Sequence, residues 1–244
     1  MSAQTTESHT PAHPLGTGDS PADDGPGALT RAWSRCFAAI YGALLWRVER
    51  RGNAERRERL LSSAEGTVVE LGAGTGHNLR YYPVDTQLVL TEPEAPMAKR
   101  LRRRVEGSDR RATVLEEPAE RLPLPAESAD TVVSTLVLCT VDDPAAALAE
   151  ASRVLRPGGW LLFIEHVAAP EGGRLRRWQE RTHDAWHRFA CGCHTNRETE
   201  ASIRAAGFEV DEIVADELEF DLPLVKPLIW GRARKPELGA EAAS

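Results

Sequence analysis

The 244-residue chain contains no long uninterrupted run of apolar residues. A membrane-spanning helix needs about 20 predominantly apolar residues, and no stretch of this sequence approaches that length. The N-terminal region also lacks a basic segment followed by an apolar one, which is the pattern of an export signal. These absences predict a cytoplasmic protein without a membrane span.

Cysteine is scarce, since the chain contains only Cys36, Cys139, Cys191 and Cys193. Without an export signal, we expect these four cysteines to be reduced. The segment CGCH at 191–194 gathers soft ligands, but a complete zinc site usually needs a second pair elsewhere, and the sequence shows none. We therefore predict that the protein binds no metal, and we assign no role to Cys191.

Positive charge is limited in amount and in kind. The net charge is −7, whereas nucleic-acid-binding proteins usually carry an excess of basic charge, so we expect no nucleic-acid partner. Arginine greatly outnumbers lysine, which favours a GC-rich bacterial genome. The one basic run, KRLRRR at 99–104, lies where Met97, Leu101 and Val105 recur every four residues. That spacing indicates an amphipathic helix with its basic groups in solvent.

The two ends of the chain differ in composition from its centre. Residues 1–27 are rich in proline and glycine and lack large apolar side chains, so we expect a disordered tail there and another at 236–244. Residues 28–65 are expected to form a helical cap or lid on a domain at 66–235. Apolar and aromatic residues recur at helical spacing over 28–49, and a membrane-surface anchor is the alternative, because tryptophan and arginine suit an interface.

From residue 67 onward, short apolar segments alternate with helical ones. The expected strands cover residues 67–71, 87–93, 112–117, 129–138, 160–167, 208–215 and 226–234. The expected helices begin at Asn78, carry the basic run, begin at Pro144 behind a capping Asp143, cover 175–189, and run from 199 to Gly207. This alternation predicts an α/β fold with a Rossmann-like seven-stranded, mostly parallel sheet and helices on both faces. Ligands bind such sheets at the carboxyl ends of the strands, where the strand order reverses.

The segment VVELGAGTGHN at 68–78 places glycines at 72, 74 and 76 directly after a strand. Glycine lets the backbone approach a ligand closely, because it has no Cβ and accepts positive φ. A dinucleotide fingerprint would need glycine at position 77, which is His77. The turn therefore indicates a nucleotide-binding site. Because position 77 is not glycine, an NAD-dependent oxidoreductase is the weaker of the possible enzyme classes.

Two carboxylates flank this turn. Glu70 immediately precedes the glycines, where an acid suits a ligand with a positive amino group better than one with two phosphates. Glu92 lies 22 residues later at the end of the next strand, where a carboxylate can accept hydrogen bonds from ribose hydroxyls. Together they favour an amino-acid nucleoside.

Four segments, which follow one another along the chain, support the same interpretation: VVELGAGTG, TEPEAPM, PAERLPLPAESADTVVS and EASRVLRPGGWLLFIEH. Over residues 66–167 the chain thereby resembles the class I S-adenosylmethionine-dependent methyltransferases. The resemblance implies S-adenosylmethionine as methyl donor and S-adenosylhomocysteine as product. The family's polar contact to the adenine amine has no side-chain match here, and a backbone group at Ala119 can substitute for it. The implied cofactor-binding residues are Glu70, Gly72, Ala73, Gly74, Gly76, Asn78, Glu92, Pro93, Met97, Ala119, Glu120 and Leu136.

Further segments narrow the resemblance: YYP at 81–83, STLVLCTVDDP at 134–144, FIEHV, WQERTHDAWHR and GCHTNRET. Over residues 66–234 the chain resembles the methyltransferase-like thiol methyltransferases and their bacterial relatives. That similarity implies a small, hydrophobic acceptor, with a thiol as the leading candidate. We expect a monomer or homodimer. A thiol of pKa about 8.5 needs less help from a base than an alcohol does. Methylation at oxygen, nitrogen or carbon of a metabolite, quinone or lipid is the alternative.

Histidines supply the candidate bases, because histidine changes its charge near neutral pH. His166 stands at the end of the strand at 160–167, and His183 and His194 follow in a later segment; we predict His166 and His183 as the catalytic residues. The alternative for His166 is a structural hydrogen bond that orients the strand end. An aromatic stripe in the later segment either lines an acceptor pocket or packs in the core; it consists of Trp178, Trp186 and Phe189.

Overall fold

The computed structural model describes residues 53–190, 192–218 and 222–237. The expected N-terminal tail and the helix at 28–49 lie outside the described residues, as do Cys191 and most of the expected C-terminal tail.

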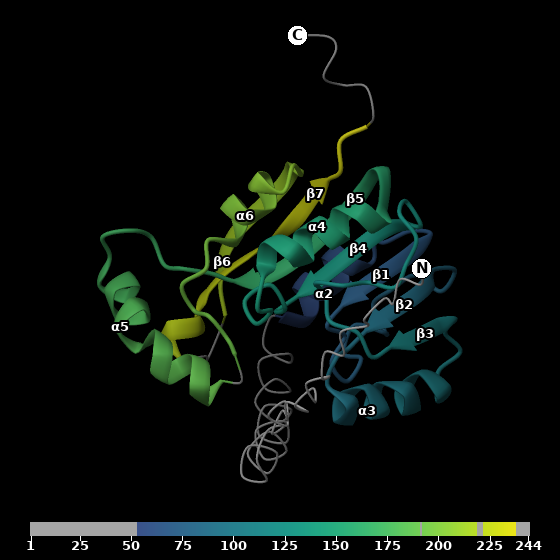
Figure 1. Ribbon diagram of the computed structural model, residues 1–244, viewed down its shortest axis with the longest axis horizontal. Helices are drawn as coiled ribbons and strands as arrows, with labels where there is room; N and C mark the ends of the chain where they lie inside the picture. The colour runs from purple at the N-terminus through teal and green to yellow at the C-terminus, as the bar shows by residue number, and fades with distance from the viewer. Residues whose placement is uncertain (1–52, 191, 219–221, 238–244) are drawn as a thin grey trace, which may run out of the picture.

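Seven strands form one sheet, as the alternating pattern predicts. They are β1 (Thr67–Leu71), β2 (Gln87–Thr91), β3 (Ala112–Leu115), β4 (Ala129–Thr135), β5 (Leu155–His166), β6 (Glu209–Glu217) and β7 (Pro227–Arg234). The strand order is β3-β2-β1-β4-β5-β7-β6 (Figure 1). Strands β1 to β5 are parallel, whereas β7 runs antiparallel to both β5 and β6. The sheet is therefore mostly parallel, and its order reverses between β1 and β4.

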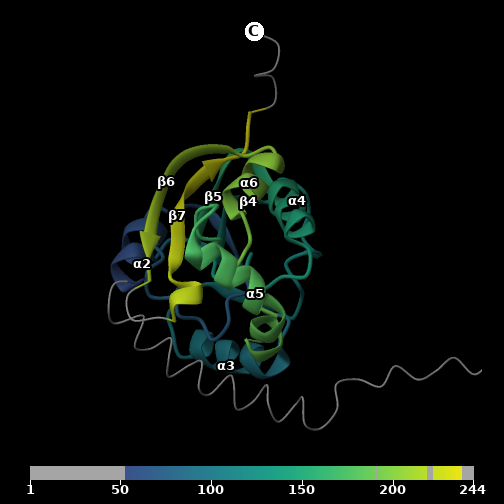
Figure 2. The same ribbon diagram turned by 90° about the vertical axis from the view of Figure 1, so that its left-hand side faces the viewer.

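Helices cover both faces of the sheet. The described α-helices are α2 (Ala54–Leu61), α3 (Ala95–Glu106), α4 (Pro144–Val154), α5 (Arg174–Phe189) and α6 (Thr199–Ala205), with a short 3-10 helix η2 (Pro223–Val225). In Figure 2, α2 lies on one side of the sheet and α4 and α6 lie on the other. Helix α3 buries Leu101 and leaves Lys99 and Arg103 exposed, which confirms that the basic run is the solvent face of a helix.

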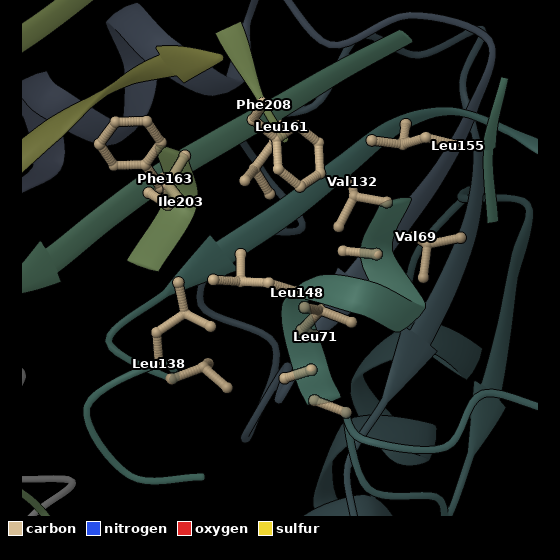
Figure 3. Packing of buried hydrophobic residues seen from close by; sticks show 14 of the residues in the cluster. Val69, Leu71, Val132, Leu138, Leu148, Leu155, Leu161, Phe163, Ile203 and Phe208 are labelled. Atoms are coloured by element: carbon tan, nitrogen blue, oxygen red, sulfur yellow. The ribbon is translucent and has the colours of Figure 1, made fainter. Parts of the chain in front are cut away.

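The core follows from the alternation of side chains along each strand. On one face, Leu148 of α4 and Ile203 of α6 pack against Phe163 of β5 (Figure 3). On the other face, Leu60 of α2 and Leu101 of α3 pack against the neighbouring strands. The central strands, where the order of the sheet reverses, are therefore buried on both faces.

Two local signals confirm the expected helix boundaries. The Asp143 side chain accepts hydrogen bonds from the backbone N–H groups of Ala145 and Ala146, so it is the N-cap of α4. Gly207 takes a φ of +85° just beyond α6, which is the left-handed position that glycine favours at a helix end.

The structure corrects the segment after the glycine turn. Residues 74–81 form consecutive turns, and the helix expected to begin at Asn78 is absent from this described segment. The glycines take positive φ, and the side chains of Asn78 and Tyr82 bond back to Glu70, so the chain folds over the end of β1. These tertiary contacts replace the helical hydrogen bonds.

Strand ends also differ from the expectation. Strand β5 begins at Leu155, five residues before the expected start, because Leu155 pairs with Ala129 of β4. Strand β4 ends at Thr135 rather than at residue 138, because Leu136 turns away with a φ of +58°. Strands β2 and β3 end at Thr91 and Leu115, two residues earlier than expected. The carboxyl ends of the strands are thus shorter, and more of the chain there is loop.

Candidate active site

The glycine turn follows β1 at the point where the strand order reverses. Gly72, Gly74 and Gly76 have φ values of +54°, +59° and +81°. A Cβ at Gly72 would lie 2.8 Å from Val137, and one at Gly76 would lie 2.8 Å from Leu101. A Cβ at Gly74 would meet nothing within 4 Å. The outer glycines therefore serve the packing of the protein, and the middle one borders open space where a ligand can lie.

Glu92 ties the end of β2 to this turn. Its Oε2 accepts a hydrogen bond from the backbone N–H of Gly74 at 2.9 Å, and its Oε1 accepts one from the N–H of Glu94, also at 2.9 Å. Burial raises the pKa of this carboxyl, although the two backbone hydrogen bonds oppose the rise. The sequence placed Glu92 near the glycine turn, and the structure brings the two together. Its contact with a ribose stays a prediction.

Glu70 lies in a buried network beneath the turn. Its Oε1 accepts a hydrogen bond from Asn78 Nδ2 at 2.7 Å, and its Oε2 accepts one from the Tyr82 hydroxyl at 2.9 Å. Arg57 of α2 donates to Asn78 Oδ1. Burial raises the pKa of Glu70 to about 7, against the lowering effect of the hydrogen bonds from Tyr82 and Asn78. The carboxyl therefore anchors the turn, and its contact with the cofactor stays a prediction.

Sequence reasoning missed two members of this network. Tyr82 belongs to the YYP segment, which carried only a family resemblance. Arg57 belongs to the segment assigned to a helical cap, and nothing in its spacing indicates that its side chain is buried. The network joins residues from three separate segments, so only the fold could reveal it.

The other predicted cofactor residues lie around the carboxyl ends of β1 to β4. Ala73 and Ala119 are buried, Pro93 is exposed, and Met97 is half-buried in the first turn of α3. The Leu136 N–H donates to the Ile164 carbonyl at 2.8 Å. Glu120 behaves differently from the rest, because its carboxylate accepts from the backbone N–H of Asp142 at 2.9 Å and so braces the loop after β4. Its cofactor contact stays a prediction.

His166 ends β5 and faces a pair of cysteines. Its Nε2 lies 3.2 Å from Cys193 Sγ, and Cys139, in the loop after β4, completes the group. One ligand atom from each of the three residues lies within 4.8 Å of the others, and all three residues are buried. The Nδ1 of His166 is buried without a hydrogen-bond partner among the described residues. The imidazole thus forms a hydrogen bond with Cys193, which is compatible with the structural alternative, and a catalytic role for His166 stays a prediction.

His183 lies in a neighbouring group of imidazoles. Its Nε2 is 2.8 Å from His194 Nδ1, and its Nδ1 is 3.1 Å from the Asp184 carboxylate. The rings of His187 and His194 stand 4.6 Å apart. Burial, followed by the positive charge of Arg197, lowers the pKa of His194 to about 4. His194 is therefore neutral near pH 7 and can accept a hydrogen bond from His183.

The two predicted catalytic histidines are linked through consecutive residues. His166 contacts Cys193 and His183 contacts His194, so the chain at 193–194 joins the end of β5 to α5. Sequence reasoning considered the CGCH segment by itself as a possible metal site. It did not predict that Cys139 and His166, from two other parts of the chain, contact Cys193.

The aromatic side chains on α5 differ in their burial. Trp186 packs against the buried group of Cys139, Ala190 and Cys193. Trp178 and Phe189 are 48% and 52% exposed, so the alternative of core packing does not hold for these two side chains within the described part of the chain. An acceptor pocket shared with residues 28–49 stays a prediction, because those residues lie outside the described part.

None of the described helices is long and apolar enough to cross a membrane.

Comparison with known proteins connects this site to a family. Residues 69–163 match the model of a methyltransferase domain. The chain is 35% identical over 179 residues to the thiol S-methyltransferase TMT1B of Rattus norvegicus, covering 71% of this chain and 72% of the rat protein. It is 33% identical over 211 residues to human TMT1B, covering 82% of this chain and 86% of the human protein.

A solved structure agrees with the sequence comparisons. A methyltransferase from Thermotoga maritima, described as dependent on S-adenosylmethionine, has 26% identity and a TM-score of 0.58 and covers 83% of this chain and 99% of its own. The relatives are methyltransferases, which supports a small-molecule substrate. The chain belongs to the class I S-adenosylmethionine-dependent methyltransferases and is close to the thiol S-methyltransferases.

Proposed function

We propose that this enzyme transfers the methyl group of S-adenosylmethionine to the sulfur of a small hydrophobic thiol. The observation that carries the proposal is the similarity to thiol S-methyltransferases over more than 70% of both chains. A second observation supports it: imidazole and thiol groups gather at the ends of β4 and β5, beside the strand whose turn would hold the cofactor.

The cofactor would lie along the carboxyl ends of β1 and β2. Gly74 leaves space for it, and the Glu92 carboxylate is placed to accept hydrogen bonds from its ribose hydroxyls. Pro93 and Met97 would lie near the adenine. S-adenosylmethionine supplies a methyl group already activated as a sulfonium, so the donor side of the site mainly positions it.

In the transfer step, the acceptor sulfur attacks the methyl carbon while the bond between that carbon and the sulfonium breaks. The products are a thioether and S-adenosylhomocysteine, and the proton of the acceptor thiol passes to a base. His183 is half-buried and paired with a neutral His194, so we assign the proton to His183. His166 is enclosed with Cys193, and we assign it to the acceptor side of the site.

The test is a panel of thiols, phenols and amines of matched size, assayed with methyl-labelled S-adenosylmethionine. We expect labelled thioethers from the thiols and rates at least about 100-fold lower from the phenols and amines, because neither is deprotonated as easily near pH 7 or as nucleophilic once it is. Faster labelling of phenols or amines would replace the thiol with oxygen or nitrogen as the acceptor.

A further inference from the structure

We propose that Cys139, His166 and Cys193 form a binding site for Zn²⁺ on the acceptor side of the active site. Their ligand atoms lie within 4.8 Å of one another, and all three residues are buried. This inference departs from the prediction that no metal is bound, which rested on the CGCH segment alone.

The donor set fits zinc chemically. Thiolate sulfur and imidazole nitrogen are the ligands that structural and catalytic zinc sites use most, at about 2.3 Å and 2.0–2.1 Å from the ion. A tetrahedral ion at those distances would hold its ligand atoms about 3.5–3.8 Å apart. In the structure His166 Nε2 is 3.2 Å from Cys193 Sγ, and no two of the three ligand atoms are more than 4.8 Å apart, so the observed separations bracket those values.

The site is also assembled by the fold. Cys139 follows β4, His166 ends β5, and Cys193 follows α5, so three elements converge on one point. The Cys193 segment is held in place by two hydrogen bonds, one from the His194 N–H to the Cys139 carbonyl at 2.7 Å and one from the Arg197 guanidinium to the Leu138 carbonyl. The ligands are therefore placed by backbone contacts that do not depend on the ion.

Charge favours a dication in this position. Two thiolates and Zn²⁺ sum to zero, so the set can be buried with a neutral imidazole at little electrostatic cost. The ring nitrogen that faces the sulfur is Nε2, 3.2 Å from Cys193 Sγ, so the ion would bind at Nε2. Binding would replace two S–H bonds with S–Zn bonds and release two protons to solvent.

The described residues supply three ligands, which leaves one position of a tetrahedral ion for a further group. Three protein ligands and one open position are the pattern of catalytic rather than structural zinc. An acceptor thiol would bind that position as its thiolate, because the ion lowers the pKa of a coordinated thiol, and its proton would pass to His183. This last step rests on the proposed thiol acceptor, whereas the metal site itself does not.

The test uses the full chain, purified under reducing conditions, stripped with a chelator and reloaded. We expect one equivalent of Zn²⁺ to remain bound through gel filtration. Co²⁺ in its place should give the intense visible bands of a tetrahedral site and a sulfur-to-metal charge-transfer band. Cys139→Ser and Cys193→Ser should each lower metal affinity at least about tenfold and weaken the charge-transfer band, whereas Cys36→Ser, the matched control, should change neither.

A second measurement does not depend on whether the variants fold. In the wild-type chain, bound Zn²⁺ should slow alkylation of Cys139 and Cys193, and a chelator should restore it, as read by mass spectrometry of peptides. The proposal is overturned if no charge-transfer band forms, if Cys193→Ser binds metal as the wild type does, or if the protein purified under reducing conditions retains a Cys139–Cys193 disulfide.

The acceptor step has its own readout. A short alkanethiol added to the Co²⁺ protein should shift the visible bands, and the alkanol of the same length should not. Unchanged bands with the thiol would overturn the acceptor step and leave the metal site standing. Failure of the proposed function would instead appear as absent thioether product in the methyl-transfer assay, whatever the metal content.

Discussion

The proposed cofactor half and acceptor half of the active site consist of different chemical groups. The half that would hold the cofactor consists of a backbone turn with three positive-φ glycines and two buried carboxylates, Glu70 and Glu92. The half that would hold the acceptor consists of imidazoles and thiols on β5, on α5 and in the loops that follow β4 and α5, centred on His166 and Cys193. A cofactor shared by many enzymes can be held by backbone shape, whereas an acceptor is selected by reactive side chains. Each half can therefore be perturbed without the other.

The largest expected effect concerns the charge of Glu70 on the cofactor side. Its pKa in the fold is about 7 against an ordinary 4.5, so the folded protein holds a proton that the unfolded chain has lost. Stability should therefore fall as pH rises from about 4.5 to about 7, by roughly 3 kcal/mol in total. In urea unfolding of the cofactor-free protein, Glu70→Gln should lack this loss and be more stable than the wild type at pH 8.

The exposed residue Glu58 provides the control for that experiment. Glu58→Gln should shift the unfolding free energy by less than about 0.5 kcal/mol at both pH 5 and pH 8. If Glu70→Gln and the wild type showed parallel pH dependence, the buried carboxyl would not be the source of the effect.

The second effect separates packing from ligand contact within the glycine turn. Gly74→Ala places a methyl group in open space, so we expect a stability loss of about 1 kcal/mol from its positive φ. The methyl group would occupy space needed by the cofactor, and affinity for S-adenosylhomocysteine should fall about 30-fold by calorimetry, equivalent to about 2 kcal/mol.

Gly72→Ala is the matched comparison, since its added methyl would lie 2.8 Å from Val137. It should lose more stability than Gly74→Ala. The assignment of the ligand to the Gly74 side fails if Gly74→Ala binds S-adenosylhomocysteine as the wild type does.

A third, smaller effect concerns the ribose contact. Glu92→Gln retains one oxygen for the Gly74 N–H, but it loses the acceptor for the Glu94 N–H and the charge that strengthens hydrogen bonds from ribose hydroxyls. Affinity for S-adenosylhomocysteine should fall about tenfold, about 1.4 kcal/mol, with an unchanged circular dichroism spectrum. Affinity equal to that of the wild type would remove Glu92 from the cofactor site.

The smallest effect lies on the acceptor side. His183→Ala should leave affinity for S-adenosylhomocysteine unchanged while it lowers kcat about fivefold for an alkanethiol and less for a more acidic aryl thiol at pH 7. An equal defect for both thiols would show that His183 does not take the proton. A loss of cofactor affinity would break the separation of the two halves.

The difference between the halves also decides what the sequence could predict. The turn is one continuous segment, and Gly72, Gly74, Gly76 and Glu92 stand at fixed spacing, so the residue pattern alone predicted that the turn and Glu92 lie together. Strand alternation likewise predicted the sheet. The helix expected at Asn78 was wrong, because side-chain bonds to Glu70 outweigh local periodicity over so short a segment.

The acceptor side could not be predicted in the same way. Cys139, His166 and Cys193 are separated by 27 residues at each step, and no spacing rule links residues that the sheet and a distant loop bring together. Arg57 is missed for the same reason, because its burial against Asn78 depends on how α2 packs over the sheet. Only the assembled fold shows these contacts.

The central claim is that the methyl group passes from S-adenosylmethionine to sulfur. The most direct measurement offers the enzyme 4-mercaptophenol, which carries a thiol and a hydroxyl on one small hydrophobic ring, and identifies the methylated atom by mass spectrometry and NMR. We predict the S-methyl product alone, formed together with one equivalent of S-adenosylhomocysteine. An O-methyl product, formed while the thiol remains free, would contradict the claim.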